Sequence, residues 1–344
     1  MRTEAKRRIG RILKFLAAVF AVAILAGITY EQLGQRKDRR RFPQVGHSVD
    51  IGGRSLNINC AGEGNPAVIL DTGGSAPGLT NLPLQALIAK LTRTCWFDRA
   101  GLGWSDPSSV TQTGAAIADD LHALLHAAGV APPYILVGQS FSGFNVRVFA
   151  GKYPSEVAGI VLLDSVQEDQ QQYEPRSTLA PVNRLPREVR SLLCRVVPLA
   201  VRVGVVRLLL NVSGPSREVP PGLTKDQVTT LHGLELQPKS FVAGAGCNAW
   251  EQSAAQARAA GKIGDLPLMV LTAGKPLAIG DPEVDKELAV FHEIWVHQLQ
   301  PKLAQLSIRG RQVIVENSIH GIAGEMPGAA VDAIREVLSE VRAK

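Results

Sequence analysis

One serine stands between a predicted strand and a predicted helix, where its hydroxyl could act as a nucleophile. Residues 134–137 form an apolar run rich in strand-forming residue types, and residues 144–150 have a helical pattern. The intervening segment is Gly138-Gln139-Ser140-Phe141-Ser142-Gly143. Small residues two before, two after and three after Ser140 allow the strand and the helix to approach closely around a strained turn. We therefore predict that Ser140 is a nucleophile and that Ser142 meets the steric need that glycine usually meets.

A serine hydroxyl is a poor nucleophile at neutral pH unless an imidazole accepts its proton, and the chain has seven histidines. His122 and His126 are one helical turn apart, but no third ligand is apparent beside them, so we predict a helix surface and no metal. His292 and His297 are five residues apart, a spacing that does not place both rings on one helix face. Spacing alone does not select the base.

The elements that must position this chemistry alternate between strand and helix. Such alternation is typical of a mainly parallel sheet that is covered on both faces. From residue 165 to about 264 the alternation stops, and helical patches separated by proline-rich breaks predict an inserted helical cap or lid. Strands are predicted at residues 46–51, 55–60, 67–70, 94–98, 134–137, 159–164, 267–272 and 311–316, and helices at residues 82–91, 117–128, 144–150, 283–306 and from 327 onward.

The charge of the chain is concentrated at its N-terminus. The net charge is +6, but residues 1–41 hold eleven Lys or Arg and three Asp or Glu, so the remainder is slightly acidic. Because no basic face remains in the globular part, a nucleic-acid partner is excluded from the prediction.

Residues 15–30 contain no charged side chain and follow a basic segment, residues 1–14. With Lys14 at its boundary, the apolar span at 12–30 approaches the length that crosses a bilayer, so we predict a transmembrane signal-anchor followed by a polar linker at 31–43. A cleaved signal peptide, giving a secreted protein, and a buried helix are the alternatives. The basic residues on the two sides are nearly balanced, and the short basic N-terminus favours a single-pass topology with an extracytoplasmic main domain.

Several motifs in sequence order resemble those of the α/β-hydrolase fold family, in particular its serine esterases and lipases. The Gly138–Gly143 turn is one, and the segment from Asp98 to Ser105 is similar to the family's D-x-R-G-x-G-x-S turn. Ser318-Ile319-His320 followed by Pro327 resembles the family's G-H…P ending, with serine in place of glycine. The resemblance covers residues 44 to 343. It implies an eight-stranded sheet flanked by helices, with a core of residues 44–164 and 265–344 and a cap of residues 165–264.

The resemblance also implies roles for particular residues. His320, after the last strand, is expected to be the base for Ser140. The acid that orients it is expected to be Asp164 at the end of the sixth strand, with Asp281 as the alternative and Glu283 or Asp285 less favoured. The oxyanion hole is expected to use the N–H groups of Phe141 and Gly74. The family's chemistry implies no metal and no organic cofactor.

Four cysteines bear on the compartment, since an even number beyond a membrane span permits two disulfides. In the family's fold the second strand runs antiparallel beside the fourth, which implies a disulfide between Cys60 and Cys95. Cys194 and Cys247 could form a bridge within the cap. In each case free buried thiols are the alternative.

We predict a membrane-anchored serine hydrolase that cleaves a carboxylic ester through an acyl-enzyme. The apolar stretch at residues 196–210 favours a hydrophobic small-molecule substrate, although a lid packed on its own core would look the same. The alternatives are the same fold acting on an amide, lactone, thioester or N-terminal peptide bond, and a binding or sensor protein of hydrolase fold without turnover.

Overall fold

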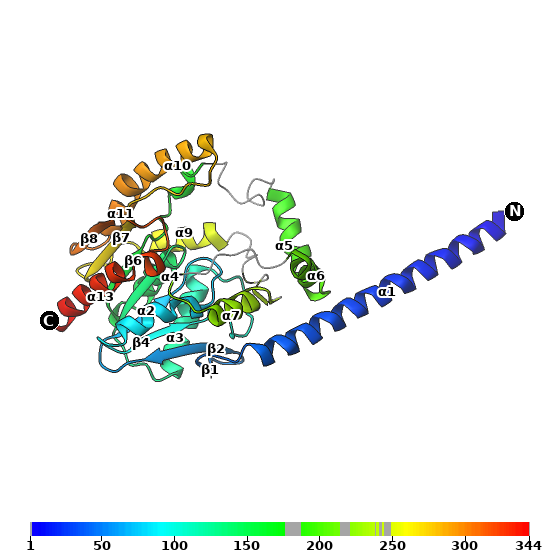
Figure 1. The fold of residues 1–344 in the computed structure, drawn as a ribbon, viewed down its shortest axis with the longest axis horizontal. Coiled ribbons are helices and arrows are strands. Elements are labelled where there is room, and N and C mark those ends of the chain that lie inside the picture. The colour runs from blue at the N-terminus through cyan, green and yellow to red at the C-terminus, as the bar shows by residue number, and fades with distance from the viewer. Residues whose placement is uncertain are drawn as a thin grey trace.

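The computed structural model describes residues 2–175, 187–213, 221–237, 239–240, 243 and 249–343. Its centre is an eight-stranded sheet in the order β1-β2-β4-β3-β5-β6-β7-β8 (Figure 1). The pairs β1–β2 and β2–β4 are antiparallel and all other pairs are parallel, which confirms the mainly parallel sheet. The strands are β1 (His47–Asp50), β2 (Ser55–Ala61), β3 (Ala67–Asp71), β4 (Thr94–Phe97), β5 (Tyr134–Gln139), β6 (Val157–Leu163), β7 (Leu268–Ala273) and β8 (Gly310–Val315).

Helices cover both faces of the sheet, because the central strands are apolar on both sides. In β5, Tyr134 and Leu136 enter one apolar cluster with the helices at residues 114–127, 142–152, 249–260 and 300–304. Ile135 and Val137 enter the other cluster with the helices at residues 82–88, 225–235 and 327–342. Flanking the sheet are α2 (Leu82–Ile88), α3 (Gly114–Ala127), α4 (Ser142–Lys152), α9 (Ala249–Ala260), α10 (Pro282–Ile294), α11 (Gln300–Ala304), α12 (Ile322–Glu325) and α13 (Pro327–Arg342), with single turns η1 (Gly78–Asn81), η2 (Pro154–Glu156) and η3 (Gln170–Gln172).

Several helices lie in the described part of the chain between β6 and β7, joined by turns and irregular segments. They are α5 (Arg187–Arg202), α6 (Val205–Ser213) and α7 (Lys225–Glu235), followed by α9. The last of these helices packs on the sheet layer, since Ser253 Oγ accepts a hydrogen bond from the Gly114 N–H at the start of α3. A parallel β6–β7 connection needs such a crossover helix. The helix α9 therefore belongs to the layer that covers the sheet, although its residues lie inside the predicted cap, which ended at residue 264.

The predicted helix at residues 283–306 is interrupted. A π-helical segment, η5 (Trp295–Leu299), separates α10 from α11. Pro301 lies in the first turn of α11, where its missing N–H cannot complete the α-helical ladder of the preceding turn. The widened turn brings Trp295 to the sheet, where its side chain is buried.

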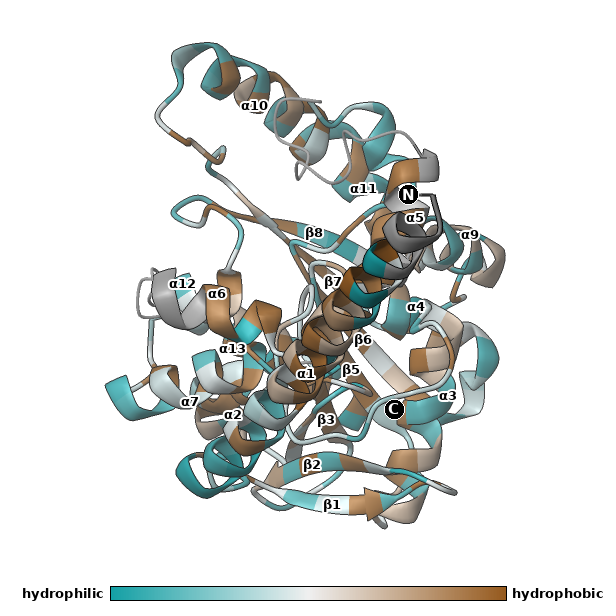
Figure 2. Cartoon of the chain, turned by 90° about the vertical axis from the view of Figure 1, so that its right-hand side faces the viewer, coloured by the Kyte–Doolittle hydropathy of each residue, from teal (hydrophilic) through white to brown (hydrophobic). Residues whose placement is uncertain are grey.

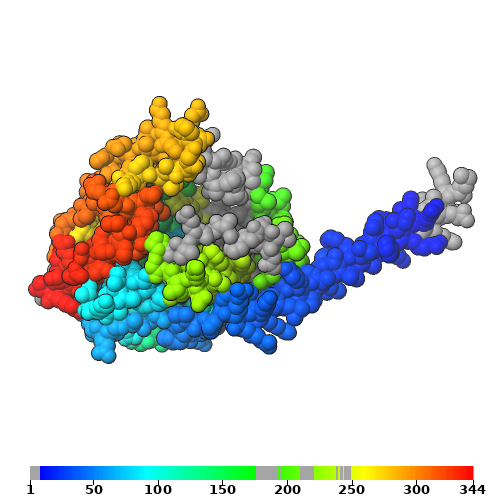
Figure 3. Space-filling model, in the orientation of Figure 1, coloured from blue at the N-terminus to red at the C-terminus, as the bar shows by residue number. Residues whose placement is uncertain are grey.

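The N-terminal helix α1 (Arg2–Arg41) extends well beyond the globular part (Figure 3). It contains an apolar window with a mean hydropathy of 2.4, none of it buried, so α1 is long and apolar enough to cross a membrane and is not a buried core helix. The helix continues through residues 31–41, which the sequence suggested were a linker. These residues are mostly good helix formers, and Arg207 of α6 pairs with Glu31 and Asp38 there.

A disulfide joins Cys60 on β2 to Cys95 on β4, which are direct partners in the antiparallel register. Cys95 is fully buried in the core. The second predicted disulfide, Cys194–Cys247, lies outside the residues and side chains that the structure describes.

Candidate active site

Ser140 occupies the sharp turn between β5 and α4 with a φ of 50°, a left-handed conformation that non-glycine residues rarely adopt. The turn depends on small neighbours. A Cβ added at Gly138 would lie 2.9 Å from Val146 Cγ2, and one added at Gly143 would lie 2.6 Å from Ser165 Cβ. The glycines therefore allow β5, α4 and the end of β6 to meet, and the turn presents the Ser140 hydroxyl beyond the sheet.

Ser142, which replaces the usual glycine, is fully buried. Its hydroxyl lies 2.9 Å from the carbonyl oxygen of Asp71 and 2.8 Å from that of Gln139. A hydroxyl carries one proton, so it donates to one of these two acceptors at a time. This contact links the end of β3 to the turn that carries Ser140, a bond that glycine could not make.

The structure brings Ser140, His320 and Asp164 together at the carboxyl ends of β5, β8 and β6. His320 Nε2 lies 3.1 Å from Ser140 Oγ, and His320 Nδ1 lies 2.6 Å from Asp164 Oδ2. These are the distances at which an imidazole can accept a serine proton while a carboxylate fixes its tautomer. The arrangement can therefore activate a hydroxyl for attack on an acyl carbonyl.

The Asp164 carboxylate is held on both of its oxygens. Oδ2 accepts from His320, whereas Oδ1 accepts from the Ala273 N–H at 3.0 Å and from the Trp295 indole N–H at 2.8 Å. Asp164 has a φ of 42°, and its side chain is only 5% exposed. Two neutral donors and a strained backbone thus fix its orientation toward the imidazole.

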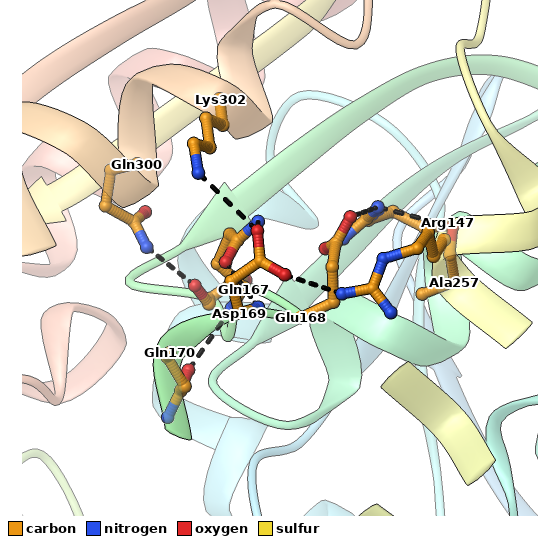
Figure 4. A network of polar contacts seen from close by, with 10 residues as sticks. Arg147, Gln167, Glu168, Asp169, Gln170, Ala257, Gln300 and Lys302 are labelled. Carbon is orange, nitrogen blue, oxygen red and sulfur yellow. Dashed lines mark hydrogen bonds and ion pairs between the residues drawn. The ribbon is translucent and has the colours of Figure 1, made fainter. Parts of the chain in front are cut away.

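The segment after Asp164 is fixed by helices from both sides (Figure 4). Arg147 of α4 pairs with Glu168 at 2.6 Å and donates to the Ala257 carbonyl of α9, and Gln300 of α11 donates to the Ser165 carbonyl at 2.7 Å. Burial raises the pKa of Glu168, but the hydrogen bond and charge of Arg147 outweigh it, so this pKa lies below the ordinary value. Glu168 remains an anion, and the segment stays anchored to α4.

Glu325 organises the loop that carries His320. Its carboxylate accepts from the Ser318 hydroxyl at 2.8 Å, from the Ile319 N–H at 2.6 Å and from the Gly321 N–H at 2.8 Å. Burial raises the pKa of Glu325, but these hydrogen bonds outweigh it and hold the pKa below its ordinary value. The serine found here in place of the family's glycine therefore has a partner in this chain.

The surroundings of His320 favour its protonated form. The hydrogen bond to Asp164 raises the pKa of His320, burial of the ring opposes this rise, and the charges of Asp164 and Glu325 add to it. A raised pKa makes the imidazole a stronger base, and it also requires a higher pH for the ring to be free to accept the serine proton.

The two backbone N–H groups of the predicted oxyanion hole belong to Phe141, directly after Ser140, and to Gly74, in the loop after β3. Among the described residues, neither group donates to another part of the chain. A Cβ added at Gly73 would lie 2.9 Å from the Cβ of Ser140, so the loop after β3 approaches the serine closely. Arg99 holds this loop in place. Its guanidinium donates to the Gly74 carbonyl, and its Nε lies 3.7 Å from Asp71 Oδ1.

The turn predicted at residues 98–105 supports this position of Arg99. Asp98 is fully buried, and its carboxylate accepts from the Gly78 N–H at 2.6 Å and from the Trp104 N–H at 3.0 Å. The turn thereby holds Arg99 beside the loop after β3. Arg99 and Gly74 both line a cavity of about 210 Å³ together with Phe141 and Trp250, so a mainly apolar space adjoins the predicted oxyanion hole.

The alternative acid Asp281 has a different environment. Its Oδ1 accepts from the N–H groups of Glu283 at 3.0 Å and Val284 at 3.2 Å, which makes Asp281 the N-cap of α10. The carboxylate of Asp285 accepts from the Ile279 and Gly280 N–H groups. Both acids are engaged in the conformation of the loop before α10.

The histidine pair on α3 has a neighbour that its spacing did not reveal. His122 Nε2 and His126 Nε2 lie 3.1 Å and 3.0 Å from the same oxygen, Glu156 Oε1. Glu156 is 30 residues beyond His126 and reaches the pair only because α3 and α4 pack side by side.

Three residues support the site in ways that the sequence analysis did not predict: Glu325, Trp295 and Arg99. Arg99 lay inside a recognised motif, and Glu325 lies seven residues after the serine that departs from the family's glycine. That departure was the one available signal for Glu325. No local pattern links Trp295 to Asp164, which are 131 residues apart.

Comparison with known proteins gives a consistent result. Residues 74–185 match a family model described as the alpha/beta hydrolase fold. The uncharacterized protein YbdG of Bacillus subtilis is 27% identical over 151 residues, which are 43% of this chain and 46% of that protein. The chain spans less than half the length of the curated relatives it matches.

Two solved structures are similar over most of the chain. An esterase from Thermogutta terrifontis superimposes with a TM-score of 0.56 at 20% identity, over 87% of this chain and 99% of the esterase. A structure described as a putative lipase from Acinetobacter baumannii gives a TM-score of 0.57 at 18% identity, over 91% and 96% of the two chains. At these identities the similarity establishes the shared fold.

Proposed function

We propose that this chain, which has the α/β-hydrolase fold and matches that family's model over residues 74–185, is a serine hydrolase that cleaves a carboxylic ester through an acyl-enzyme on Ser140. The observation that carries the proposal is the continuous line of contacts from Ser140 Oγ through His320 to Asp164. The left-handed backbone at Ser140 supports it further, because strain of this kind is retained where it presents a functional group.

In the first half of the reaction, Ser140 Oγ attacks the ester carbonyl while His320 Nε2 accepts the serine proton. The charge that develops on the carbonyl oxygen is stabilised by the N–H groups of Phe141 and Gly74. A preorganised donor of this kind contributes about 3 kcal/mol to the transition state. The resulting imidazolium then gives its proton to the departing alcohol, and the acyl group stays on Ser140.

In the second half, a water molecule takes the place of the alcohol. His320 accepts a proton from that water, which attacks the acyl carbonyl, and the tetrahedral species collapses to release the acid and restore the Ser140 hydroxyl. Throughout, Asp164 holds Nδ1 of the ring and stabilises the imidazolium. The Ala273 and Trp295 donors hold the Asp164 carboxylate in the orientation that this role requires.

The proposal includes membrane anchoring through α1, with residues 12–30 as the transmembrane segment and the catalytic domain on the extracytoplasmic side. The length, hydropathy and exposure of α1 support the anchor. The Cys60–Cys95 disulfide supports the orientation, since disulfides persist mainly in oxidising compartments. The proposed organisation is a core of residues 44–164 and 265–344, to which α9 adds a covering helix, with a substrate-selecting cap in the chain before α9.

A carboxylic ester is the proposed substrate class, and an amide, lactone, thioester or N-terminal peptide bond would use the same side chains. Relatives that open epoxides or remove halides place aspartate at the nucleophile position, where this chain has Ser140.

Labelling with a fluorescent fluorophosphonate tests the proposal, because this probe reacts with activated serines. We expect covalent labelling of the full-length protein in detergent, its complete loss in Ser140→Ala and a large loss in His320→Ala. Ser155→Ala, an exposed serine in η2, is the matched control and should label like the wild type. Labelling that is indifferent to both Ser140→Ala and His320→Ala, or absent from the wild type, would contradict the proposal.

A further inference from the structure

Two cap helices pack directly against the N-terminal helix. The turn between α5 and α6 meets α1 through glycines, because a Cβ at Gly27 would lie 2.3 Å from the Val203 carbonyl oxygen and one at Gly204 would lie 2.8 Å from the Gly27 carbonyl oxygen. Glycine at such contacts lets two helices approach closely, as it does in membrane proteins. The contact lies at the end of the uncharged stretch of α1.

An ion-pair network fixes this arrangement just beyond the uncharged stretch. Arg207 on α6 makes two hydrogen bonds to Glu31, at 2.9 Å and 3.0 Å, and one to Asp38 at 2.7 Å. The side chains of Arg207 and Glu31 are only 10% and 4% exposed. A bidentate, buried pair has a defined geometry, so α6 is held at a fixed height along α1.

The outer side of the same two helices is apolar and exposed. Figure 1 shows α5 and α6 on the side of the molecule from which α1 extends, and Figure 2, viewed from that side, shows apolar residues on α6 and along α1. We call this surface the α5–α6 apolar face. It comprises Leu192, Val196, Leu199, Val205 and Leu208, which are 44–60% exposed.

We propose that the α5–α6 apolar face binds the surface of the lipid bilayer that α1 spans. The bilayer is the proposed partner because the apolar face adjoins the last apolar turn of α1. The Arg207 network fixes the face at that position along α1. A helix with one apolar face at this level lies in the headgroup region with its apolar side buried by about 5–10 Å. Arg202 is exposed on α5, and Arg36, Lys37, Arg39, Arg40 and Arg41 follow the uncharged stretch of α1, so cationic side chains that attract anionic lipid headgroups flank the apolar face.

This inference rests on the proposed anchoring by α1, and the experiment separates the two. A fluorescent non-natural amino acid is placed singly at positions 20, 199, 208 and 308 of the full chain in nanodiscs containing nitroxide-labelled lipid. Position 308 is the control, because Ile308 is 86% exposed but precedes β8, which lies at the opposite side of the molecule from α1 (Figure 1).

We expect loss of emission at positions 20, 199 and 208 and none at position 308. Loss at position 20 alone would overturn the bilayer contact while leaving the anchor intact, whereas no loss at position 20 would refute the anchor itself. Self-association of the chain that protects positions 199 and 208 from quenching would assign the face to a second copy and would also overturn the proposal.

A separate observation concerns His122, His126 and Glu156. All three ligand atoms lie within 4.8 Å of one another, and the two Nε2 atoms are 3.1 Å and 3.0 Å from Glu156 Oε1. Ligands at zinc-bond lengths in a tetrahedral site lie about 3.3 Å apart. The other Glu156 oxygen, Oε2, is buried and has no hydrogen-bond partner among the described residues.

The geometry points to a divalent transition-metal site, of the kind that Zn²⁺ occupies, formed by these three side chains. The ring of His122 is fixed by stacking on Tyr153, with centroids 3.9 Å apart and planes 8° from parallel. Three protein ligands leave one position for water. Such a site would tie α3 to η2 on the protein surface.

Titration of the tag-free full-length protein with Zn²⁺ tests this site. We expect one Zn²⁺ per chain and a loss of affinity of at least about tenfold in His126→Gln. His297→Gln is the matched control, because the ion-pair partner of His297 in the described part of the chain is Glu293, whose Oε2 lies 3.4 Å from His297 Nε2. Equal affinity in the wild type and His126→Gln would overturn the site, and metal-free melting curves of all variants identify any loss of folding.

Discussion

The substitution Glu325→Gln tests how the His320 loop is positioned. The Glu325 carboxylate accepts three hydrogen bonds from the loop, at 2.6 to 2.8 Å. Glutamine presents one acceptor oxygen and one NH₂ group, so whichever way the amide turns, at least one N–H of the loop faces another donor. Hydrogen bonds to a charged group contribute about 1.5–3 kcal/mol each.

Glu325 is exposed, and water replaces part of what is lost, so we take a value near the lower limit. A loss of about 1.4 kcal/mol reduces the equilibrium constant for the ordered loop roughly tenfold, so kcat/KM should fall by up to that factor. The negative charge of Glu325 also contributes to the raised pKa of His320. The variant should therefore shift the acid limb of the kcat/KM profile to lower pH, an effect that a purely structural role would not produce.

Steady-state hydrolysis of a chromogenic short-chain ester across pH, with melting curves to confirm folding, provides the measurement. Glu336→Gln is the matched control, because Glu336 pairs with Arg311 on the surface, away from the His320 loop, and should change neither quantity. If Glu325→Gln kept the wild-type kcat/KM and the wild-type acid limb, the reasoning about the loop would be refuted.

The remaining predictions concern the acid, the base and the disulfide. Asp164→Asn should lower turnover of the same ester by several orders of magnitude, as the loss of the orienting carboxylate does in other triads. Asp281→Asn should leave turnover near wild type and lower only the melting temperature. The reverse ranking of the two variants would reassign the acid. Because the pKa of His320 is raised, the acid limb of kcat/KM should have its midpoint above about 6.5, and a midpoint at or below that value would contradict the Asp164 contact. The same raised pKa implies that protonated His320 stabilises the folded state fully below about pH 6.5 and that this contribution is lost as pH rises through the folded-state pKa, so the stability difference between the wild type and His320→Gln should shrink in that direction. Replacing Cys60 and Cys95, which are 35 residues apart, by serine should lower the free energy of unfolding in denaturant titrations by about 2–4 kcal/mol, and an unchanged midpoint would argue against the bridge.

Features encoded by short stretches could be predicted from the sequence. The strand-to-helix pattern around Ser140 depends on residues within one turn of it, and Asp164 directly follows a buried apolar strand. Strand positions were recognisable because buried parallel strands are continuous apolar runs. In such a sheet the carboxyl ends of the strands meet at one edge, so the topology already implied that Ser140, Asp164 and His320 would lie near one another.

Features that depend on tertiary contacts could not be predicted in this way. Asp164 and Asp281 could not be separated by sequence, since the path of the loop before α10 decides which one reaches His320. The contact of Trp295 with Asp164 requires the π-helical turn, and the helical state of residues 31–41 depends partly on Arg207, far along the chain.

The central claim is that Ser140 carries the acyl group during turnover. Acid quenching during hydrolysis of a chromogenic ester, followed by peptide mass spectrometry, locates that group directly. We predict the acyl mass on Ser140 in the wild-type protein and on no residue in Ser140→Ala. An acyl group on another residue, or hydrolysis that persists in Ser140→Ala at the wild-type rate, would contradict the account.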